Sequence, residues 1–193
     1  MDLALHTRWV VLVEGPSDQA ALEALARRFG RDLGREAVEV VSIGGAHGVG
    51  RFMSAIPEHV RAAGLCDSGE VVPFGRALER AGAGPAGTRD ELEALGFYVC
   101  DPDLEGELIR ALGAAGVEGV LDRSGKLASF RTFQKQPQWR DCPVEAQLRR
   151  FFGSSAGKTR HAPLLVEALD LDHVPRPLAS LLGHVSRSGL WRA

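Results

Sequence analysis

The stretch from Val10 to Asp18 constrains the fold of this chain more than any other segment. It consists of four apolar residues, three of them β-branched, followed by an acid, a glycine and a proline. The apolar run predicts a short buried strand, and Ser17 or Asp18 can cap a helix that follows it. Glu14 then stands at the carboxyl end of a strand, where open α/β sheets bind their ligands. Two carboxylates beside a glycine suit a divalent cation and a phosphate, whereas the alternative is a helix cap and a solvated loop charge.

The chain has 193 residues, of which 45% are hydrophobic and 25% are charged. This composition is typical of a globular protein. No apolar run approaches the roughly 20 residues that span a bilayer, so we expect no membrane association. Met1 to Arg8 show no signal-peptide pattern, and we therefore expect a cytoplasmic location. The cysteines Cys66, Cys100 and Cys142 are scattered and form no CxxC pair, which argues against zinc and against a disulfide framework.

Charged residues are distributed unevenly along the chain. Residues 1–122 contain 20 acidic and 11 basic residues, a net charge of −9, whereas residues 123–160 contain 2 and 9, a net charge of +7. An acidic part followed by a basic part fits a metal site joined to a surface that contacts phosphates, although unrelated solvated faces would give the same totals. We predict an α/β core over residues 1–122 and a basic, mainly helical extension packed on it over residues 123–193.

Apolar periodicity predicts alternating strands and helices in the first part. The predicted strands are 9–14, 38–43, 62–66 and 96–100, with Val117–Leu121 as a last strand. The predicted helices between them are 17–30, 51–60, 71–81 and 89–95. This alternation indicates a mostly parallel sheet of four to five strands flanked by helices. Further helices are expected over 127–136, 144–152, 157–169 and 178–185.

Acidic residues follow three of these strands. The pairs are Glu14 with Asp18, Asp67 with Glu70, and Asp103 with Glu105. Neighbouring parallel strands would bring their carboxyl ends together, and that many carboxylates cannot gather without cations. Oxygen ligands favour Mg²⁺ or Mn²⁺ over zinc, and a pair of such ions stabilises the attacking and leaving oxygens of a phosphoryl displacement. The positive group that such a reaction also needs is found in the basic part, chiefly Lys158.

Three motifs in this order carry a resemblance to a known family. They are Leu12-Val13-Glu14-Gly15-Pro16-Ser17-Asp18, Asp103-Leu104-Glu105-Gly106-Glu107-Leu108 and Gly157-Lys158-Thr159-Arg160-His161-Ala162. Over residues 8–170 the chain resembles the Toprim domain of topoisomerases, primases and OLD-type nucleases, and is most similar to that of OLD-type endonucleases. The resemblance implies a Rossmann-like Toprim core with a C-terminal helical extension.

The resemblance also implies roles for individual residues. Glu14 and Asp18 would hold a metal ion, and Glu14 would also act in acid–base steps. Asp103 and Glu105 would complete the second metal position. Lys158 would match the lysine that stabilises the transition state in the nucleases.

One position departs from the family pattern. The family has Asp-x-Asp where this chain has Asp67-Ser68-Gly69. Asp67 matches the first aspartate, and the next acid is Glu70. Glu70 could reach a metal through its longer side chain or through a water molecule.

From the residues and the resemblance together we expect a nuclease. The reaction would be a phosphodiester hydrolysis dependent on two Mg²⁺ or Mn²⁺ ions, with DNA as the substrate and RNA as the alternative. The DNA backbone would be held by the basic residues Arg131, Lys135, Arg140, Arg149, Arg150 and Arg160. A solvated helix surface is the simpler explanation of any one of them.

We expect no ATP site. The segment Ser154-Ser155-Ala156-Gly157-Lys158-Thr159 looks like the end of a P-loop, but Phe152 stands where the first glycine is required. OLD-type proteins usually carry an ATPase domain before the Toprim domain. This chain leaves no room for one, so the expected partner is a separate ATPase chain, or none.

Two other functions remain open at this stage. One is a non-catalytic Toprim module that binds nucleic acid and regulates a partner protein. The other is an α/β protein whose acids bind a magnesium nucleotide. A topoisomerase is disfavoured because the chain's one tyrosine, Tyr98, falls inside a predicted strand.

Overall fold

A computed structural model describes residue 4, residues 6–154 and residues 158–186, without the side chains of residues 154–160. Its centre is a four-stranded sheet of order β2-β1-β3-β4, in which all neighbours pair in parallel. The strands are β1 (Trp9–Val13), β2 (Val38–Ser42), β3 (Arg61–Asp67) and β4 (Phe97–Cys100). The expectation of an α/β fold around a parallel sheet is confirmed.

Strand β1 is buried on both faces, which explains its uninterrupted apolar sequence. Val10 and Leu12 belong to one hydrophobic cluster, while Val11 and Val13 belong to the other. This division follows from the two-residue repeat of a strand, which turns alternate side chains to opposite faces. The Glu14 carboxylate therefore follows a segment that packing holds firmly in place.

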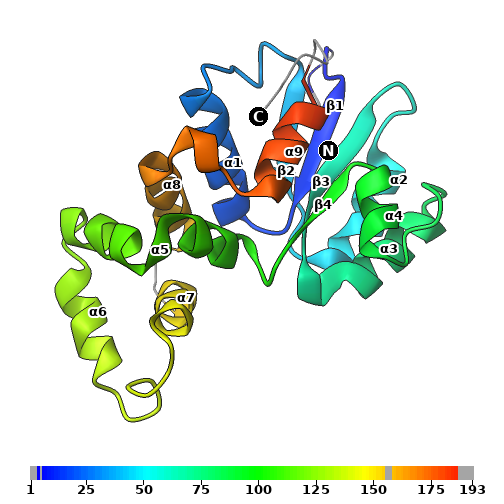
Figure 1. Ribbon diagram of the computed structural model, residues 1–193. Coiled ribbons are helices and arrows are strands. Elements are labelled where there is room, and N and C mark those ends of the chain that lie inside the picture. The colour runs from blue at the N-terminus through cyan, green and yellow to red at the C-terminus, as the bar shows by residue number, and fades with distance from the viewer. Residues whose placement is uncertain (1–3, 5, 155–157, 187–193) are drawn as a thin grey trace.

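Helices cover both faces of the sheet (Figure 1). On one face lie α1 (Pro16–Arg28), α8 (Lys158–Ala168) and α9 (Arg176–His184), whose apolar residues share a cluster with Val11 and Val13. On the other lie α2 (Val49–Ala55), α3 (Val71–Arg80) and α4 (Arg89–Ala94). Short 3-10 turns lie at Ala46–Gly48, Ser68–Glu70 and Leu171–His173. Among the described helices, none is both long enough and apolar enough to cross a membrane.

Three further helices form an arm that extends away from the sheet (Figure 1). They are α5 (Leu104–Arg123), α6 (Leu127–Gln134) and α7 (Val144–Ser154). Phe130 packs edge-on against Phe151, with 5.3 Å between the ring centroids. The buried amide of Gln147 donates to the carbonyl oxygens of Trp139 (2.8 Å) and Cys142 (2.9 Å). These bonds fix the loop between α6 and α7.

Two expectations about secondary structure are wrong. Val117–Leu121 is not a strand but part of α5, where Val117, Val120 and Leu121 are buried at the spacing of a helix. The helix expected over residues 51–60 ends at Ala55, because Ile56 precedes Pro57 and takes an extended conformation (ψ 125°).

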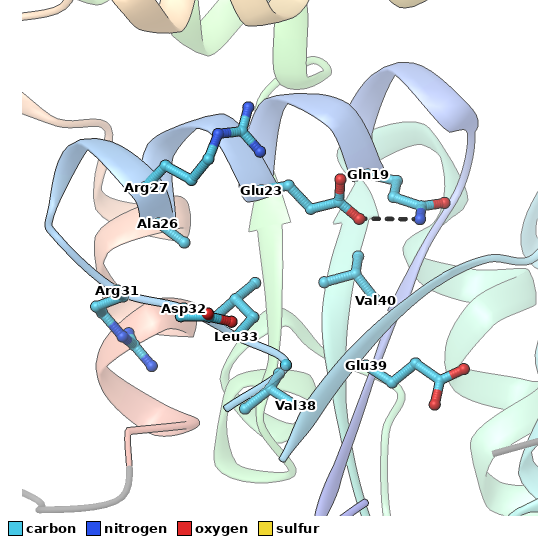
Figure 2. A pocket seen from close by; sticks show the side chains of 11 residues that line it. Gln19, Glu23, Ala26, Arg27, Arg31, Asp32, Leu33, Val38, Glu39 and Val40 are labelled. Atoms are coloured by element: carbon cyan, nitrogen blue, oxygen red, sulfur yellow. Dashed lines mark hydrogen bonds between the residues drawn. The ribbon is translucent and has the colours of Figure 1, made fainter. Parts of the chain in front are cut away.

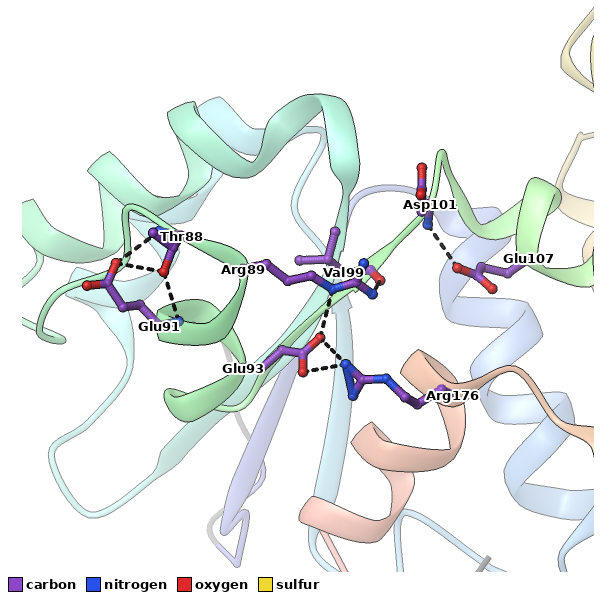
Figure 3. A network of polar contacts seen from close by, with 8 residues as sticks. All are labelled: Thr88, Arg89, Glu91, Glu93, Val99, Asp101, Glu107 and Arg176. Carbon is purple, nitrogen blue, oxygen red and sulfur yellow. Dashed lines mark hydrogen bonds and ion pairs between the residues drawn. The ribbon is translucent and has the colours of Figure 1, made fainter.

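A network of charges fastens α9 to the core (Figure 3). Arg176 Nη2 donates to both carboxylate oxygens of Glu93, at 2.7 and 2.6 Å. Arg89 donates through Nε to Glu93 (3.1 Å) and through Nη2 to the carbonyl oxygen of Val99 (2.9 Å). Helices α4 and α9 are thereby tied together beside strand β4.

Candidate functional site

The carboxyl ends of β1, β3 and β4 meet at one edge of the sheet, and a pocket of about 480 Å³ opens there. Its lining comprises Glu14, Gly15, Pro16, Ser17, Asp18, Gly45, Asp67, Asp103, Glu105, Arg149 and Gly153. Five of the six acids predicted for the site therefore share this pocket. These five acids come from a stretch of 92 residues, Glu14 to Glu105. They meet because parallel strands end at the same edge of the sheet.

Glu14 links two strand ends and a glycine loop. Its Oε1 accepts a hydrogen bond from the backbone N–H of Asp67 at 3.3 Å. Its carbonyl oxygen accepts from the N–H groups of Gly44 (3.0 Å) and Gly45 (3.2 Å). Both glycines have positive φ angles, 73° and 95°, which other residues adopt at a cost. The glycine-rich loop thus lies beside the pocket and shapes the backbone around Glu14.

Asp18 lies in the first turn of α1. Its Oδ2 accepts a hydrogen bond from the N–H of Gly15 at 2.8 Å, and Pro16 occupies the first helical position. A carboxylate is stabilised near a helix N-terminus, and proline fits that position because its missing N–H has no helical partner. The sequence Glu-Gly-Pro-Ser-Asp therefore turns the chain sharply and places both acids on one side.

Crowding and burial raise the proton affinity of these carboxylates. Burial, opposed in part by the bond from Gly15, raises the pKa of Asp18 to about 7. Burial, followed by the negative charge of Glu14, raises the pKa of Asp67 to about 8. The pKa of Glu14 is raised as well, again chiefly by burial. Such groups gain most from a bound cation, which would balance charges that now repel one another.

Asp103 joins the pocket to the helical arm. Its Oδ1 caps α5 by accepting from the N–H of Gly106 (2.8 Å), and its Oδ2 accepts from Arg149 Nε of helix α7 (2.7 Å). Both carboxylate oxygens therefore contact protein donors. Arg149 was expected only as a contact to the DNA backbone, and its place inside the pocket could not be found from sequence spacing.

Glu107 is a buried acid that the sequence reasoning did not single out. Its Oε1 accepts from the N–H of Asp101 at 2.9 Å, and its Oε2 pairs with Arg110 at 2.8 Å. Arg110 also donates to the carbonyl oxygen of Asp101. These contacts hold the segment that leads from β4 to Asp103. Its burial in the first turn of α5 fits this structural role.

Two predicted site residues need separate mention. Glu70 lies at the end of the Ser68–Glu70 turn and does not line the pocket, although its charge contributes to the raised pKa of Glu14. Lys158 is the first residue of α8, and its side chain lies outside the described part of the structure, as does that of Arg160.

The chemistry of the donors fits a hard divalent cation. Glu14, Asp18 and Asp67 offer oxygen ligands only, as Mg²⁺ and Mn²⁺ prefer. Within the described ranges, no three His, Cys, Asp or Glu side chains converge closely enough to complete a metal site by themselves. Mg²⁺ commonly keeps several water ligands and uses only one or two carboxylates, so this arrangement fits a hydrated ion.

The other basic residues expected to contact DNA lie on or near the arm. Arg131 already pairs with both oxygens of Glu118, at 2.9 and 2.6 Å. The guanidinium carbon of Arg150 lies 5.9 Å from the centre of a Trp139 ring, and Arg140 pairs loosely with Asp141 at 3.9 Å. Lys135 is exposed just after α6.

A larger hollow, of about 590 Å³, lies between α1 and the edge strand β2 (Figure 2). It is lined by the amino-terminal half of β2, including Val38 and Val40. It therefore lies away from the carboxyl ends of the strands, where the acids gather. Several of its polar side chains are already engaged: Gln19 donates to Glu23 at 3.0 Å, and Arg31 pairs with Glu36 at 2.5 Å. Size alone therefore does not identify the functional site.

Comparisons with known proteins support the α/β fold. Residues 5–61 match the family model for the TOPRIM domain of proteins like the overcoming lysogenization defect (OLD) protein. No curated protein matches the sequence.

Two solved structures share the fold over almost the whole chain. The C-terminal region of the OLD protein of Xanthomonas campestris pv. campestris has a TM-score of 0.71 at 23% identity, covering 93% of this chain and 92% of that one. The corresponding region from Burkholderia pseudomallei has a TM-score of 0.67 at 19% identity, covering 93% and 97%. The match over residues 5–61 and the shared fold both support a Toprim domain of OLD type in this chain.

Proposed function

We propose that this protein is a metal-dependent nuclease that hydrolyses phosphodiester bonds of DNA at the carboxylate pocket. The observation that carries the proposal is that Glu14, Asp18 and Asp67 line one pocket and that burial and nearby acids raise the pKa of all three. A structural role would not require acids to gather where their charges repel, whereas binding a cation would.

Two Mg²⁺ or Mn²⁺ ions, when bound, would supply charge for the attacking and leaving oxygens of the displacement. In this proposal Glu14, Asp18 and Asp67 would hold the ions at the strand ends, and Asp103 and Glu105, which line the same pocket, would complete the second metal position. Glu14 also accepts a proton in the reaction, for which its raised pKa is suited. Lys158 provides positive charge for the transition state.

The arm formed by α5, α6 and α7 is proposed to hold the nucleic-acid backbone. Arg140, Arg150 and Lys135 are exposed there, and contacts of this kind are independent of sequence. DNA is the expected substrate, and RNA is the alternative. A separate ATPase chain is a proposed partner.

A second candidate function is a non-catalytic module that binds nucleic acid. It is favoured by Asp103, both of whose oxygens contact protein donors, and by Gly69, which stands where the family has its second aspartate. This candidate requires DNA binding without turnover.

Cleavage of supercoiled and linear DNA distinguishes the two candidates. The purified protein is assayed with Mg²⁺, Mn²⁺, Ca²⁺ or EDTA, beside Glu14→Ala and Lys158→Ala. Matched controls are Glu58→Ala, an exposed acid, and Arg80→Ala, an exposed cation of α3, neither of which lines the pocket or belongs to the arm.

The nuclease proposal predicts nicking or degradation in Mg²⁺ or Mn²⁺, reduced about 100-fold or more by Glu14→Ala and by Lys158→Ala and unchanged by both controls. DNA binding without cleavage under every metal would favour the non-catalytic module. Cleavage that survives both Glu14→Ala and Lys158→Ala would place the site elsewhere.

A further inference from the structure

Arg149 lies between two hollows. It lines the carboxylate pocket, and it also lines a smaller hollow of about 280 Å³ between α5 and α7. The smaller hollow is lined by Pro102, Gly106, Ile109, Arg110, Glu145, Ala146 and Arg149. One side chain therefore borders both hollows.

The position of Arg149 is set by the site itself. Its Nε donates to Asp103 Oδ2 at 2.7 Å, and Asp103 is in turn fixed because its Oδ1 caps α5 through Gly106. Asp103 is only 20% exposed, whereas Arg149 is 48% exposed. The contact uses one of the five N–H donors of the guanidinium, whose planar fork can bind a phosphate while its other edge is held.

The hollow has the chemistry of a nucleotide subsite. Pro102, Ile109 and Ala146 provide apolar walls that suit the flat face of a base. Arg110 and Arg149 provide positive charge at its border, opposed by the single carboxylate of Glu145. Each guanidinium pairs with one carboxylate, Arg110 with Glu107 and Arg149 with Asp103. Arg110 also donates to the carbonyl oxygen of Asp101, whereas the Arg149 contact uses only Nε, so more of the Arg149 fork is left for an anion.

We propose that Arg149 binds the phosphate next to the one that is cleaved, and that the nucleoside attached to this phosphate occupies the hollow between α5 and α7. The proposal rests on the proposed function, since it assigns the neighbouring unit of the same substrate. It makes Arg149 a substrate-binding residue and Asp103 the residue that positions it.

The first test measures binding without cleavage. The affinity of the full chain for a fluorescent DNA oligonucleotide is measured by anisotropy in EDTA over a range of salt concentrations. We expect Arg149→Ala to weaken binding about 10-fold and to lower the salt slope by about one. Ala146→Trp, which fills the hollow, should weaken binding by a similar factor, and the double variant should be little weaker than either. Ala115→Trp, at an exposed alanine of α5 outside the hollow, is the control expected to bind like the wild type.

The second test compares substrates of different size. Bis(p-nitrophenyl) phosphate has one phosphate and no nucleoside, so it cannot use the subsite. We expect Arg149→Ala to lower kcat/KM for DNA by about 10- to 100-fold, mainly through KM, and to leave hydrolysis of the small ester within about twofold. Glu14→Ala should slow both substrates alike.

The outcomes separate this inference from the proposed function. Wild-type binding by Ala146→Trp, or equal loss on both substrates in Arg149→Ala, would overturn the subsite while the nuclease proposal stands. A wild-type protein that hydrolyses neither substrate would overturn the nuclease proposal and the subsite with it.

Discussion

The Glu14 carboxylate accepts a hydrogen bond from the backbone N–H of Asp67 at 3.3 Å, so the ends of β1 and β3 are joined at the floor of the pocket. The same contact places two acids side by side. Burial raises the pKa of both carboxyls, and the charge of Glu14 raises the pKa of Asp67 further. The site is therefore held together by backbone contacts while its charges oppose one another, and the first prediction follows from this balance.

Stability of the metal-free protein should fall as pH rises from about 4 to about 8. Asp18 and Asp67 have pKa values of about 7 and about 8 in the folded state, against an ordinary value of 3.8. The folded state therefore binds more protons than the unfolded state in this window, and the free energy of unfolding decreases with rising pH.

Asp67→Asn should make that decline shallower and raise the Tm at pH 8 by roughly 2–8 °C, because the amide carries no charge to repel Glu14. Urea and thermal unfolding in EDTA between pH 5 and 8 measure both effects. Glu58→Gln, at an exposed acid, is the control that should follow the wild type. A variant as pH-dependent as the wild type would contradict the charge repulsion inferred here.

Gly75 should be irreplaceable for packing. A Cβ added there would lie 1.8 Å from the carbonyl oxygen of Ala86, which cannot move away easily because it is backbone. Gly75→Ala should lower the free energy of unfolding by about 3 kcal/mol or more. Gly50→Ala is the matched control in another helix, where a Cβ would meet nothing within 4 Å, and it should be neutral or stabilise by about 0.5–1 kcal/mol. Equal stability of the two variants, measured by urea unfolding, would refute the close approach.

Gly106→Ala should impair the site more than the fold. The added Cβ would lie 2.7 Å from Pro102 Cδ and 3.1 Å from Asp103 Oδ1, so the Asp103 carboxylate must shift. Since that carboxylate holds Arg149, we expect DNA cleavage to fall about 10- to 100-fold. Gly119→Ala, also in α5, makes an ordinary 3.5 Å contact with Arg123 and should retain activity. Full activity in Gly106→Ala, in a kinetic assay on linear DNA, would count against the role of Asp103.

Glu93 should contribute to stability as a shared partner. It is 16% exposed and binds both Arg176 and Arg89. Arg176→Ala should cost about 1 kcal/mol, and Glu93→Ala should cost more because it leaves both guanidinium groups without this carboxylate. The double variant should cost less than the sum of the two. Strict additivity in urea unfolding would show that the pair seen in Figure 3 is not coupled.

The strand ends were predictable because a buried parallel strand is a short, continuous run of apolar residues in the sequence. The Val10–Val13 run, followed by Glu14, predicted both the central strand and the acid at its end. The same rule located Asp67 and Asp103, and parallel pairing required that all three ends meet at one edge. The fold class was therefore accessible from short segments.

Other features of the site and the fold could not be predicted from local sequence patterns. Arg149 pairs with Asp103 across 46 residues, and this contact is determined by how α7 packs on α5. Val117–Leu121 resembled a strand because a short apolar run fits either a strand or a buried helix face. Glu70 was expected in the site from its spacing alone, yet the 3-10 turn at Ser68–Glu70 directs the chain so that Glu70 does not line the pocket.

The central claim is that the pocket formed by Glu14, Asp18 and Asp67 holds a divalent cation, and Mn²⁺ binding followed by electron paramagnetic resonance tests it most directly. The account predicts saturable binding to the wild-type protein at pH 7.5, weakened at least about 10-fold in Glu14→Gln and unchanged in Glu58→Gln. Binding should also release protons, because the pKa values of Asp18 and Asp67 lie near that pH. Absence of saturable binding to the wild type, or equal binding by Glu14→Gln, would contradict the claim.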